Sequence, residues 1–158
     1  MRFFLVDRVD ELRPGEFVRG VKNVSLSEDF MGDHFPEIPV FPGTLVVEAL
    51  AQLGGFLLEC TLNKADEEVK RAVLVQINTA KFHRPAAPGD QLVLKCSLRS
   101  SLEGAAQVEG EALVQDALVC RATLTFVLRA VASEQVHKQR RELYRIWTRG
   151  LNLDFPLR

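Results

Sequence analysis

The residues best suited to chemistry in this sequence are one histidine and one glutamate that lie close together along the chain. His34 stands in residues 32–43, GDHFPEIPVFPG, a run that its prolines stiffen. Glu48 follows in an apolar segment, where burial disfavours an ionised carboxylate unless it is paired or functional. Between them Gly43 has no side chain at the start of a predicted helix, so a ligand can approach its backbone N–H. A base, an acid and an oxyanion donor suit proton abstraction beside a carbonyl, with loss or gain of a group at the next carbon.

Each of these residues also has an ordinary structural interpretation. A lone histidine in a loop is more often a surface or structural residue than a catalyst. A lone buried glutamate usually pairs with a nearby Arg or Lys. Spacing alone therefore favours the structural interpretation of His34 and Glu48. The other two histidines are His83, at a strand end, and His137, in the C-terminal tail, and we predict that both are solvated.

The cysteines and the remaining motifs offer no second chemistry. Cys60, Cys96 and Cys120 are widely spaced, form no C-x-x-C pair and have no obvious base partner, so we predict buried free thiols in a reducing compartment. The sequence contains no nucleophile elbow, glycine-rich phosphate loop or metal-spaced cluster. We therefore expect neither a metal nor a cofactor.

Length, composition and charge exclude several classes of protein. The chain has 158 residues, one domain's worth, with 47% hydrophobic residues and a net charge of −1. This balance excludes a strongly basic nucleic-acid-binding protein. The N-terminal residues become charged too soon for a secretion signal, and the apolar stretch at residues 45–60 is too short and too interrupted for a membrane span. The expectation is a cytoplasmic protein without a membrane span.

The hydrophobic pattern predicts one buried helix that carries the carboxylate. Residues 42–59 are apolar almost all round, which is typical of a helix buried on every side, and Pro42 suits its first turn. Thr44, Glu48 and Gln52 recur at i, i+4 and i+8 and form one narrow polar stripe along this helix.

The strands are indicated by alternation of apolar and polar residues with period two, most clearly in the second half of the chain. Such half-buried strands, joined by short turns, are typical of an antiparallel sheet. We predict strands at residues 3–9, 17–25, 72–82, 91–99, 107–115 and 118–129. One buried helix and about six antiparallel strands predict an α+β fold in which the sheet wraps around the helix.

The C-terminal part of the chain is predicted as a separate element. Ser133 is placed to cap a helix that ends near Gly150. We predict a main domain at residues 1–132 and an extension at residues 133–158, a helix plus a short tail. One face of this helix carries Val136, Arg140, Leu143, Tyr144 and Trp147.

Residues 33–52, DHFPEIPVFPGTLVVEALAQ, closely resemble the active-site segment of the beta-hydroxyacyl-(acyl carrier protein) dehydratases of the FabZ type. That family's pattern is His-Phe-Pro, a proline-rich loop, Pro-Gly, and then Glu-Ala-x-Ala-Gln. Further matches lie at residues 6–9, 22–25 and 81–90. The resemblance implies the hotdog fold, a long central helix wrapped by a highly curved antiparallel sheet, in agreement with the hydrophobic pattern.

The resemblance also implies a reaction and its catalysts. His34 matches the catalytic histidine and Glu48 the catalytic carboxylate, while Gly43 matches the backbone donor to the thioester oxygen. The implied reaction removes water from a (3R)-3-hydroxyacyl thioester to give a trans-2-enoyl thioester. In this family the histidine of one subunit works with the glutamate of the other, in a homodimer or a trimer of dimers.

Four further positions follow from the same resemblance. We expect Phe35, Pro42 and Gln52 to contribute to the substrate site beside the catalytic residues. The substrate is carried on acyl carrier protein, which is acidic, so basic residues near the tunnel mouth should steer it. Arg84 is the candidate for that contact.

This chain departs from the family pattern in three places. Asp33 stands where the family usually has glycine, the chain begins inside the first strand without the family's Pro-His-Arg segment, and residues 133–158 extend beyond the family's usual end. Two other functions therefore stay open, an acyl thioesterase on the same fold and a non-catalytic acyl-thioester-binding or regulatory module. The presence of both His34 and Glu48 favours the dehydratase.

Overall fold

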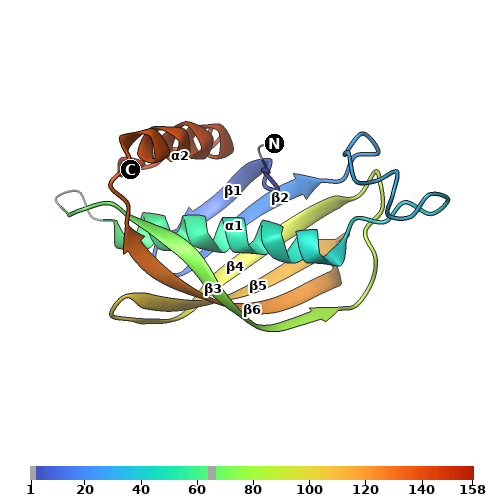
Figure 1. The fold of residues 1–158 in the computed structure, drawn as a ribbon, viewed down its shortest axis with the longest axis horizontal. Coiled ribbons are helices and arrows are strands. Elements are labelled where there is room, and N and C mark those ends of the chain that lie inside the picture. Colours follow the sequence, from blue (N-terminus) through green and yellow to red (C-terminus); the bar gives the residue numbers. More distant parts are fainter. Residues whose placement is uncertain (1–2, 64–66) are drawn as a thin grey trace.

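The computed structural model describes residues 3–63 and 67–158, in which one antiparallel sheet wraps around a long helix (Figure 1). The sheet has six strands in the order β1-β2-β4-β5-β6-β3. The elements are β1 (Arg8–Arg13), β2 (Phe17–Asn23), α1 (Gly43–Leu62), β3 (Lys70–Phe82), β4 (Gln91–Leu102), β5 (Ala105–Val114), β6 (Ala117–Ala130) and α2 (Glu134–Trp147). This is the hotdog fold, and the predicted α+β architecture is confirmed.

Strands β4, β5 and β6 form a meander whose faces match the predicted alternation. In β5 every second residue from Ala106 to Ala112 is buried, facing α1 and the neighbouring strands. The turn between β5 and β6 is made by Gln115 and Asp116, whose φ angles are 48° and 64°. Two consecutive left-handed residues are the geometry of a tight two-residue hairpin, which fixes the register of the pair.

The prediction of a strand at residues 3–9 is wrong in its position, because β1 begins only at Arg8. The Gln52 side chain accepts a hydrogen bond from the Leu5 N–H (2.9 Å) and donates one to the Phe3 carbonyl (3.0 Å). It therefore occupies backbone groups that a neighbouring strand would otherwise bind. Leu5 is buried in the core, so the apolar run predicted as a strand packs beside α1 instead.

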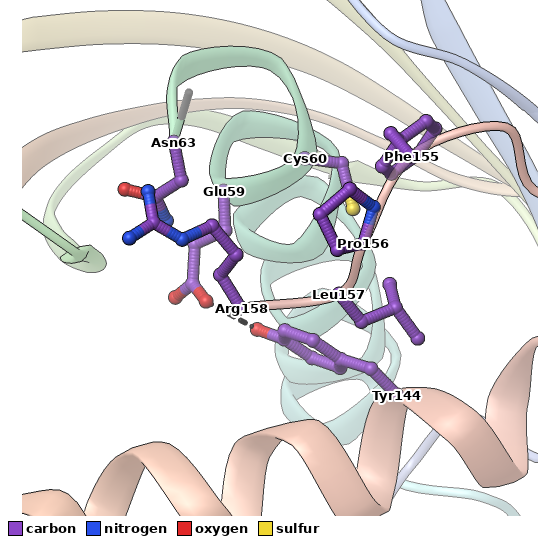
Figure 2. A pocket seen from close by; sticks show the side chains of 8 residues that line it. All are labelled: Glu59, Cys60, Asn63, Tyr144, Phe155, Pro156, Leu157 and Arg158. Atoms are coloured by element: carbon purple, nitrogen blue, oxygen red, sulfur yellow. Dashed lines mark hydrogen bonds between the residues drawn. The ribbon is translucent and has the colours of Figure 1, made fainter. Parts of the chain in front are cut away.

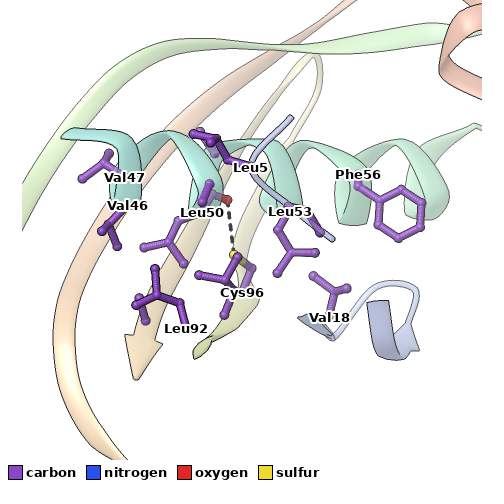
Figure 3. Packing of buried hydrophobic residues seen from close by; sticks show 14 of the residues in the cluster. Leu5, Val18, Val46, Val47, Leu50, Leu53, Phe56, Leu92 and Cys96 are labelled. Carbon is purple, nitrogen blue, oxygen red and sulfur yellow. Dashed lines mark hydrogen bonds between the residues drawn. The ribbon is translucent and has the colours of Figure 1, made fainter. Parts of the chain in front are cut away.

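The core lies between α1 and the inner face of the sheet (Figure 3). By length and composition α1 could cross a membrane, but most of the helix is buried inside this fold. Leu50 points from α1 toward Leu92, and the Cys96 thiol donates a hydrogen bond to the Leu50 carbonyl (3.4 Å) (Figure 3). Side chains of the helix thus fill the space inside the wrapped sheet.

Helix α2 begins as predicted and packs on the C-terminal half of α1. The Ser133 hydroxyl accepts a hydrogen bond from the Val136 N–H (3.4 Å), which caps the helix. Tyr144 and Trp147 are buried, and both make edge-to-face contacts with Phe56 of α1, at ring-centroid distances of 4.7 and 5.8 Å. These aromatic contacts hold α2 against α1 on the side away from the sheet (Figure 1).

Candidate active site

The loop that carries His34 is fixed by hydrogen bonds within its own backbone. The Val40 N–H donates to the His34 carbonyl (2.7 Å), and Phe35 and Ile38 exchange two backbone hydrogen bonds of 3.1 and 3.2 Å. Phe41, only 2% exposed, anchors the end of the loop in the core. The loop therefore presents its histidine from a closed turn.

The hydrogen bond that His34 makes decides where its proton lies. The imidazole Nδ1 is 2.8 Å from the Val40 carbonyl oxygen. A carbonyl can only accept, so Nδ1 carries the hydrogen, and in the neutral ring Nε2 bears the lone pair. The Phe35 ring stacks on the imidazole at a centroid distance of 4.3 Å. The imidazole is thus oriented from two sides, with Nε2 as the basic nitrogen.

The N-terminus of α1 supplies backbone donors beside an aromatic ring. The Pro42 carbonyl accepts from the N–H groups of Leu45 (2.9 Å) and Val46 (3.2 Å), while the Gly43 N–H belongs to the first turn, which has no intrahelical acceptor. A Cβ at position 43 would lie 2.8 Å from the Phe82 ring. A side chain at this position would therefore require the Phe82 ring to move.

Glu48 is half-buried on the open side of α1 and is held by one neutral donor. Gln52, one turn later, donates from Nε2 to the Glu48 Oε1 (2.9 Å). The same amide binds the backbone of the N-terminal segment at Phe3 and Leu5. The burial predicted for Glu48 is only partial within a single chain. Its carboxylate is oriented without being neutralised by a cation among the described residues.

Two separate pockets divide the predicted site residues. Gly43 lines one of about 520 Å³, together with Arg84 and the end of β3. Glu48 and Gln52 line another of about 430 Å³, together with the N-terminal segment and α2. His34 lines neither of these pockets. A single chain therefore does not bring His34 and Glu48 into one pocket.

The remaining predicted residues come from the start of α1, the segment after β3 and the tip of the His34 loop. Pro42 is the N-cap of α1, and Arg84 is exposed at the rim of the pocket that Gly43 lines. Phe35 is 56% exposed and Ile38 is 71% exposed at the tip of the loop. Asp33, the residue that departs from the family pattern, is also exposed. The loop tip thus presents apolar side chains to the outside of the chain.

A family model described as the FabA-like domain matches residues 1–123. The chain belongs to the FabA-like family. A 3-hydroxyacyl-[acyl-carrier-protein] dehydratase FabZ from Thiobacillus denitrificans is 42% identical over 127 residues, which cover 80% of this chain and 88% of the relative. The FabZ from Acidovorax sp. is 42% identical over 130 residues, covering 82% and 90%. The resemblance to the FabZ type is therefore confirmed.

A solved structure with the same fold as this FabA-like chain is a hypothetical thioesterase protein with coenzyme A from Streptococcus pneumoniae. It superposes with a TM-score of 0.64 at 17% identity, covering 83% of this chain and 91% of the other. A likeness at this level of identity establishes the fold only. The reaction has to be inferred from the residues of the site.

The structure also contains a second carboxylate site on α1, which the sequence analysis missed (Figure 2). Glu59 is 4% exposed and accepts hydrogen bonds from the Arg71 guanidinium (2.7 Å), the Tyr144 hydroxyl (2.7 Å) and the Ala72 N–H (3.0 Å). This buried pair joins α1 to β3 and α2. A lone buried glutamate was expected to pair with an arginine, and the glutamate that does so is Glu59. The sequence indicated this site only by a charged residue on an apolar helix.

The prediction that His137 is solvated is wrong. Arg71 donates from Nη2 to the His137 Nδ1 (2.8 Å), and a guanidinium has no acceptor, so Nδ1 must carry the lone pair. Nε2 then donates to the Val131 carbonyl (2.7 Å). His137 therefore belongs to the network around Glu59. His83 is exposed, as predicted.

The cysteines are free and their thiols are unreactive at neutral pH. Burial raises the pKa of Cys60 to about 12, with a smaller contribution from the neighbouring Glu59 charge, and raises the pKa of Cys120 to about 11. Burial also raises the pKa of the Cys96 thiol. Because the thiolate is the nucleophile, these residues supply no catalytic sulfur.

Proposed function

We propose that this chain dehydrates (3R)-3-hydroxyacyl thioesters on acyl carrier protein to trans-2-enoyl thioesters, with His34 as the base and Glu48 as the acid. The observation that carries the proposal is the His34 hydrogen bond to the Val40 carbonyl. It leaves the lone pair on Nε2, the nitrogen that a substrate can reach from outside the loop. Family membership and the named FabZ relatives support the same reaction.

The proposed reaction removes a proton from C2 and a hydroxide from C3 of the substrate, and Glu48 supplies the proton that turns this hydroxide into water. The His34 Nε2 takes a proton from C2 of the substrate, and the electron pair of that C–H bond forms the C2–C3 double bond. The C3–O bond breaks, and the protonated Glu48 carboxyl gives its proton to the departing hydroxyl, which leaves as water. The hydrogen bond from Gln52 orients the Glu48 carboxyl for this transfer.

The negative charge that develops on the thioester oxygen needs a donor. We assign this role to the Gly43 N–H, because the first turn of α1 presents an unused backbone donor at the positive end of the helix dipole. Gly43 directly follows the His34 loop, so both groups belong to the same half of the site. Phe35 and Pro42 would line that half beside the substrate.

We propose that a second copy of the chain completes the site. Strand β3 is at the edge of the sheet and carries a row of exposed apolar side chains, Val73, Val75 and Ile77 (44%, 54% and 51% exposed). A long apolar edge strand favours pairing with another chain. Antiparallel pairing of two β3 edges about a two-fold axis would allow His34 of one copy to work with Glu48 of the other. Assembly into a trimer of dimers remains part of the proposal.

The carrier protein would bind near Arg84. This residue is exposed at the rim of the pocket that Gly43 lines, on the side where the thioester carbonyl would lie. A positive charge at that rim would raise the rate of encounter with an acidic carrier protein and make this rate dependent on salt.

The first experiment is a spectrophotometric assay of hydration and dehydration, using crotonyl and 3-hydroxybutyryl thioesters on acyl carrier protein. The wild type is expected to turn over both, and His34→Ala and Glu48→Gln are each expected to lose about 10²- to 10⁴-fold in rate. Absence of turnover by a folded wild-type protein would contradict the proposal. Release of free thiol would instead indicate a thioesterase, and binding without turnover a non-catalytic module.

Mixing the two inactive variants tests the shared site. In an isologous dimer, a His34→Ala/Glu48→Gln heterodimer has one site with both changes and one with neither, so a random mixture should recover about a quarter of wild-type activity. If both residues acted within one chain, mixing would restore nothing. A mixture of His34→Ala with a His34→Ala/Glu48→Gln double variant is the matched control, because it cannot form an intact site.

A further inference from the structure

The pocket that Glu48 lines has two walls built from opposite ends of the chain. Its floor is formed by Glu48 and Gln52 of α1, one wall is the N-terminal segment at Phe3 and Phe4, and the other wall is one face of α2. The pocket measures about 430 Å³, within the usual range of about 300–1,000 Å³ for small-molecule sites. Glu48, the candidate acid of the reaction, is thus also a lining residue of this pocket.

Apolar side chains that remain exposed gather around this pocket. Phe3 is 43% exposed, Phe4 is 46%, Val136 is 37% and Ile146 is 56%, and all four line the pocket together with the buried Leu143. An exposed apolar patch that surrounds a few placed polar groups is the ordinary composition of a ligand site. The same face of α2 adds Gln139, Arg140 and Glu142, so the pocket has a polar rim as well.

The α2 wall is held in place by contacts that face away from the pocket. Tyr144 and Trp147 pack on Phe56, and the Tyr144 hydroxyl is bonded to the buried Glu59. This wall is therefore formed before any ligand binds. The FabA-like match ends at residue 123, so α2 lies outside the matched part of the chain.

The position of Glu48 specifies which part of a substrate would enter the pocket. This inference rests on the proposed function, in which the Glu48 carboxyl protonates the hydroxyl at C3. A carboxyl within hydrogen-bonding distance of that oxygen lies beside C3, so C4 and the rest of the acyl chain begin next to it. The thioester and its carrier lie on the other side of C3, toward the Gly43 N–H of the copy that supplies His34.

We propose that the pocket between the N-terminal segment and α2 binds the acyl chain of the substrate beyond C3, and that α2 sets the preference for chain length. A longer hydrocarbon chain gains affinity by burying methylene groups against Phe4, Val136 and Ile146. The gain ends where the pocket opens to its polar rim. A 3-hydroxybutyryl group, with only one carbon beyond C3, does not reach the α2 wall.

The proposal is tested by substitutions on α2 that fill the pocket with a larger side chain. Ile146→Trp and Val136→Trp each place a large ring in the pocket at a partly exposed position, and Lys138→Trp places the same ring at an exposed α2 residue that does not line it. The kcat/KM of each protein is measured on 3-hydroxybutyryl, 3-hydroxyoctanoyl and 3-hydroxydodecanoyl carrier protein. Circular dichroism and the unfolding midpoint report whether each variant folds.

The expected result is a loss of about 10- to 100-fold on the two longer substrates for Ile146→Trp and Val136→Trp, with 3-hydroxybutyryl turnover kept. Lys138→Trp should behave as wild type on all three. An unchanged ratio of long-chain to short-chain activity in both pocket variants overturns the inference and leaves the dehydratase standing. A wild type that turns over none of the three substrates overturns both.

Discussion

Helix α1 carries two carboxylates with opposite surroundings. Glu48 and Glu59 are about three turns apart and lie on nearly the same side of the helix. Glu59 is buried and accepts from an arginine, a phenol and a backbone N–H, whereas Glu48 is half-buried and accepts from one neutral amide among the described residues. Three donors, one of them a cation, fix the Glu59 carboxylate in the core. One amide orients the Glu48 carboxylate at the pocket that it lines.

We predict that a change at Glu59 lowers stability, whereas a change at Glu48 lowers activity. Glu59→Gln removes the carboxylate that pairs with the buried Arg71 guanidinium and is expected to lower the free energy of unfolding by about 3–5 kcal/mol. Glu48→Gln is expected to change it by less than about 1 kcal/mol while abolishing dehydration. Urea unfolding followed by the fluorescence of Trp147, the only tryptophan in the chain, measures both variants. Equal loss of stability in the two variants would remove the distinction.

Tyr144→Phe tests the same network with a smaller change. The variant keeps the ring that packs on Phe56 and loses only the hydroxyl that donates to Glu59. A hydrogen bond to a charged group contributes about 1.5–3 kcal/mol, so we expect a loss of that size in urea unfolding. Turnover of 3-hydroxybutyryl carrier protein should be unchanged. A variant as stable as wild type would mean that the hydroxyl does not support Glu59.

Gln52→Met tests the neutral donor at the other carboxylate. It removes the hydrogen bond that orients Glu48 and also those to Phe3 and Leu5. We expect kcat to fall about tenfold with little change in KM, because the carboxyl is still present but less well oriented. The conservative variant Gln52→Asn, too short to span the same atoms, is expected to behave similarly. A change confined to KM would instead place Gln52 in substrate binding.

The smallest expected effect is the contribution of Tyr144 ionisation to stability, which is measurable only in alkaline solution. Burial, followed by the Glu59 charge, raises the pKa of Tyr144 well above its usual value near 10. The folded protein therefore keeps this proton while the unfolded chain loses it, so stability conferred by the phenol is present below pH 10 and declines above it. Tyr144 is the only tyrosine, so tyrosinate absorbance reports it alone. Ionisation near pH 10 in the folded protein would contradict this environment.

Most of the fold could be predicted because its signals are local. In β4 to β6 the alternation of apolar and polar residues predicts which face is buried. In α1 the continuous apolar run predicts a helix buried on most sides. Residues 3–9 were misplaced because Leu5 and Val6 are equally apolar in a strand and in a segment packed on a helix, and only the Gln52 side chain decides between the two.

The candidate site was only partly predictable for a related reason. His34, Gly43 and Glu48 lie close together in sequence, and their motif is continuous. The network of Glu59, Arg71 and His137 joins three distant parts of the chain, so no local pattern contains it. The same holds for the α2 wall of the Glu48 pocket, which depends on where Tyr144 and Trp147 dock.

The strand order has a consequence for how the chain acquires its structure during synthesis. Strand β3 lies beside β6, although β4 and β5 come between them along the chain. Until β6 emerges from the ribosome, the apolar residues of β3 and the flank of α1 have no native partner to cover them. Pairings between strands distant in sequence slow folding and produce aggregation-prone intermediates that expose apolar surface. A nascent chain that ends after β5 should therefore depend on chaperones, and the full chain should be released from them once β6 is complete.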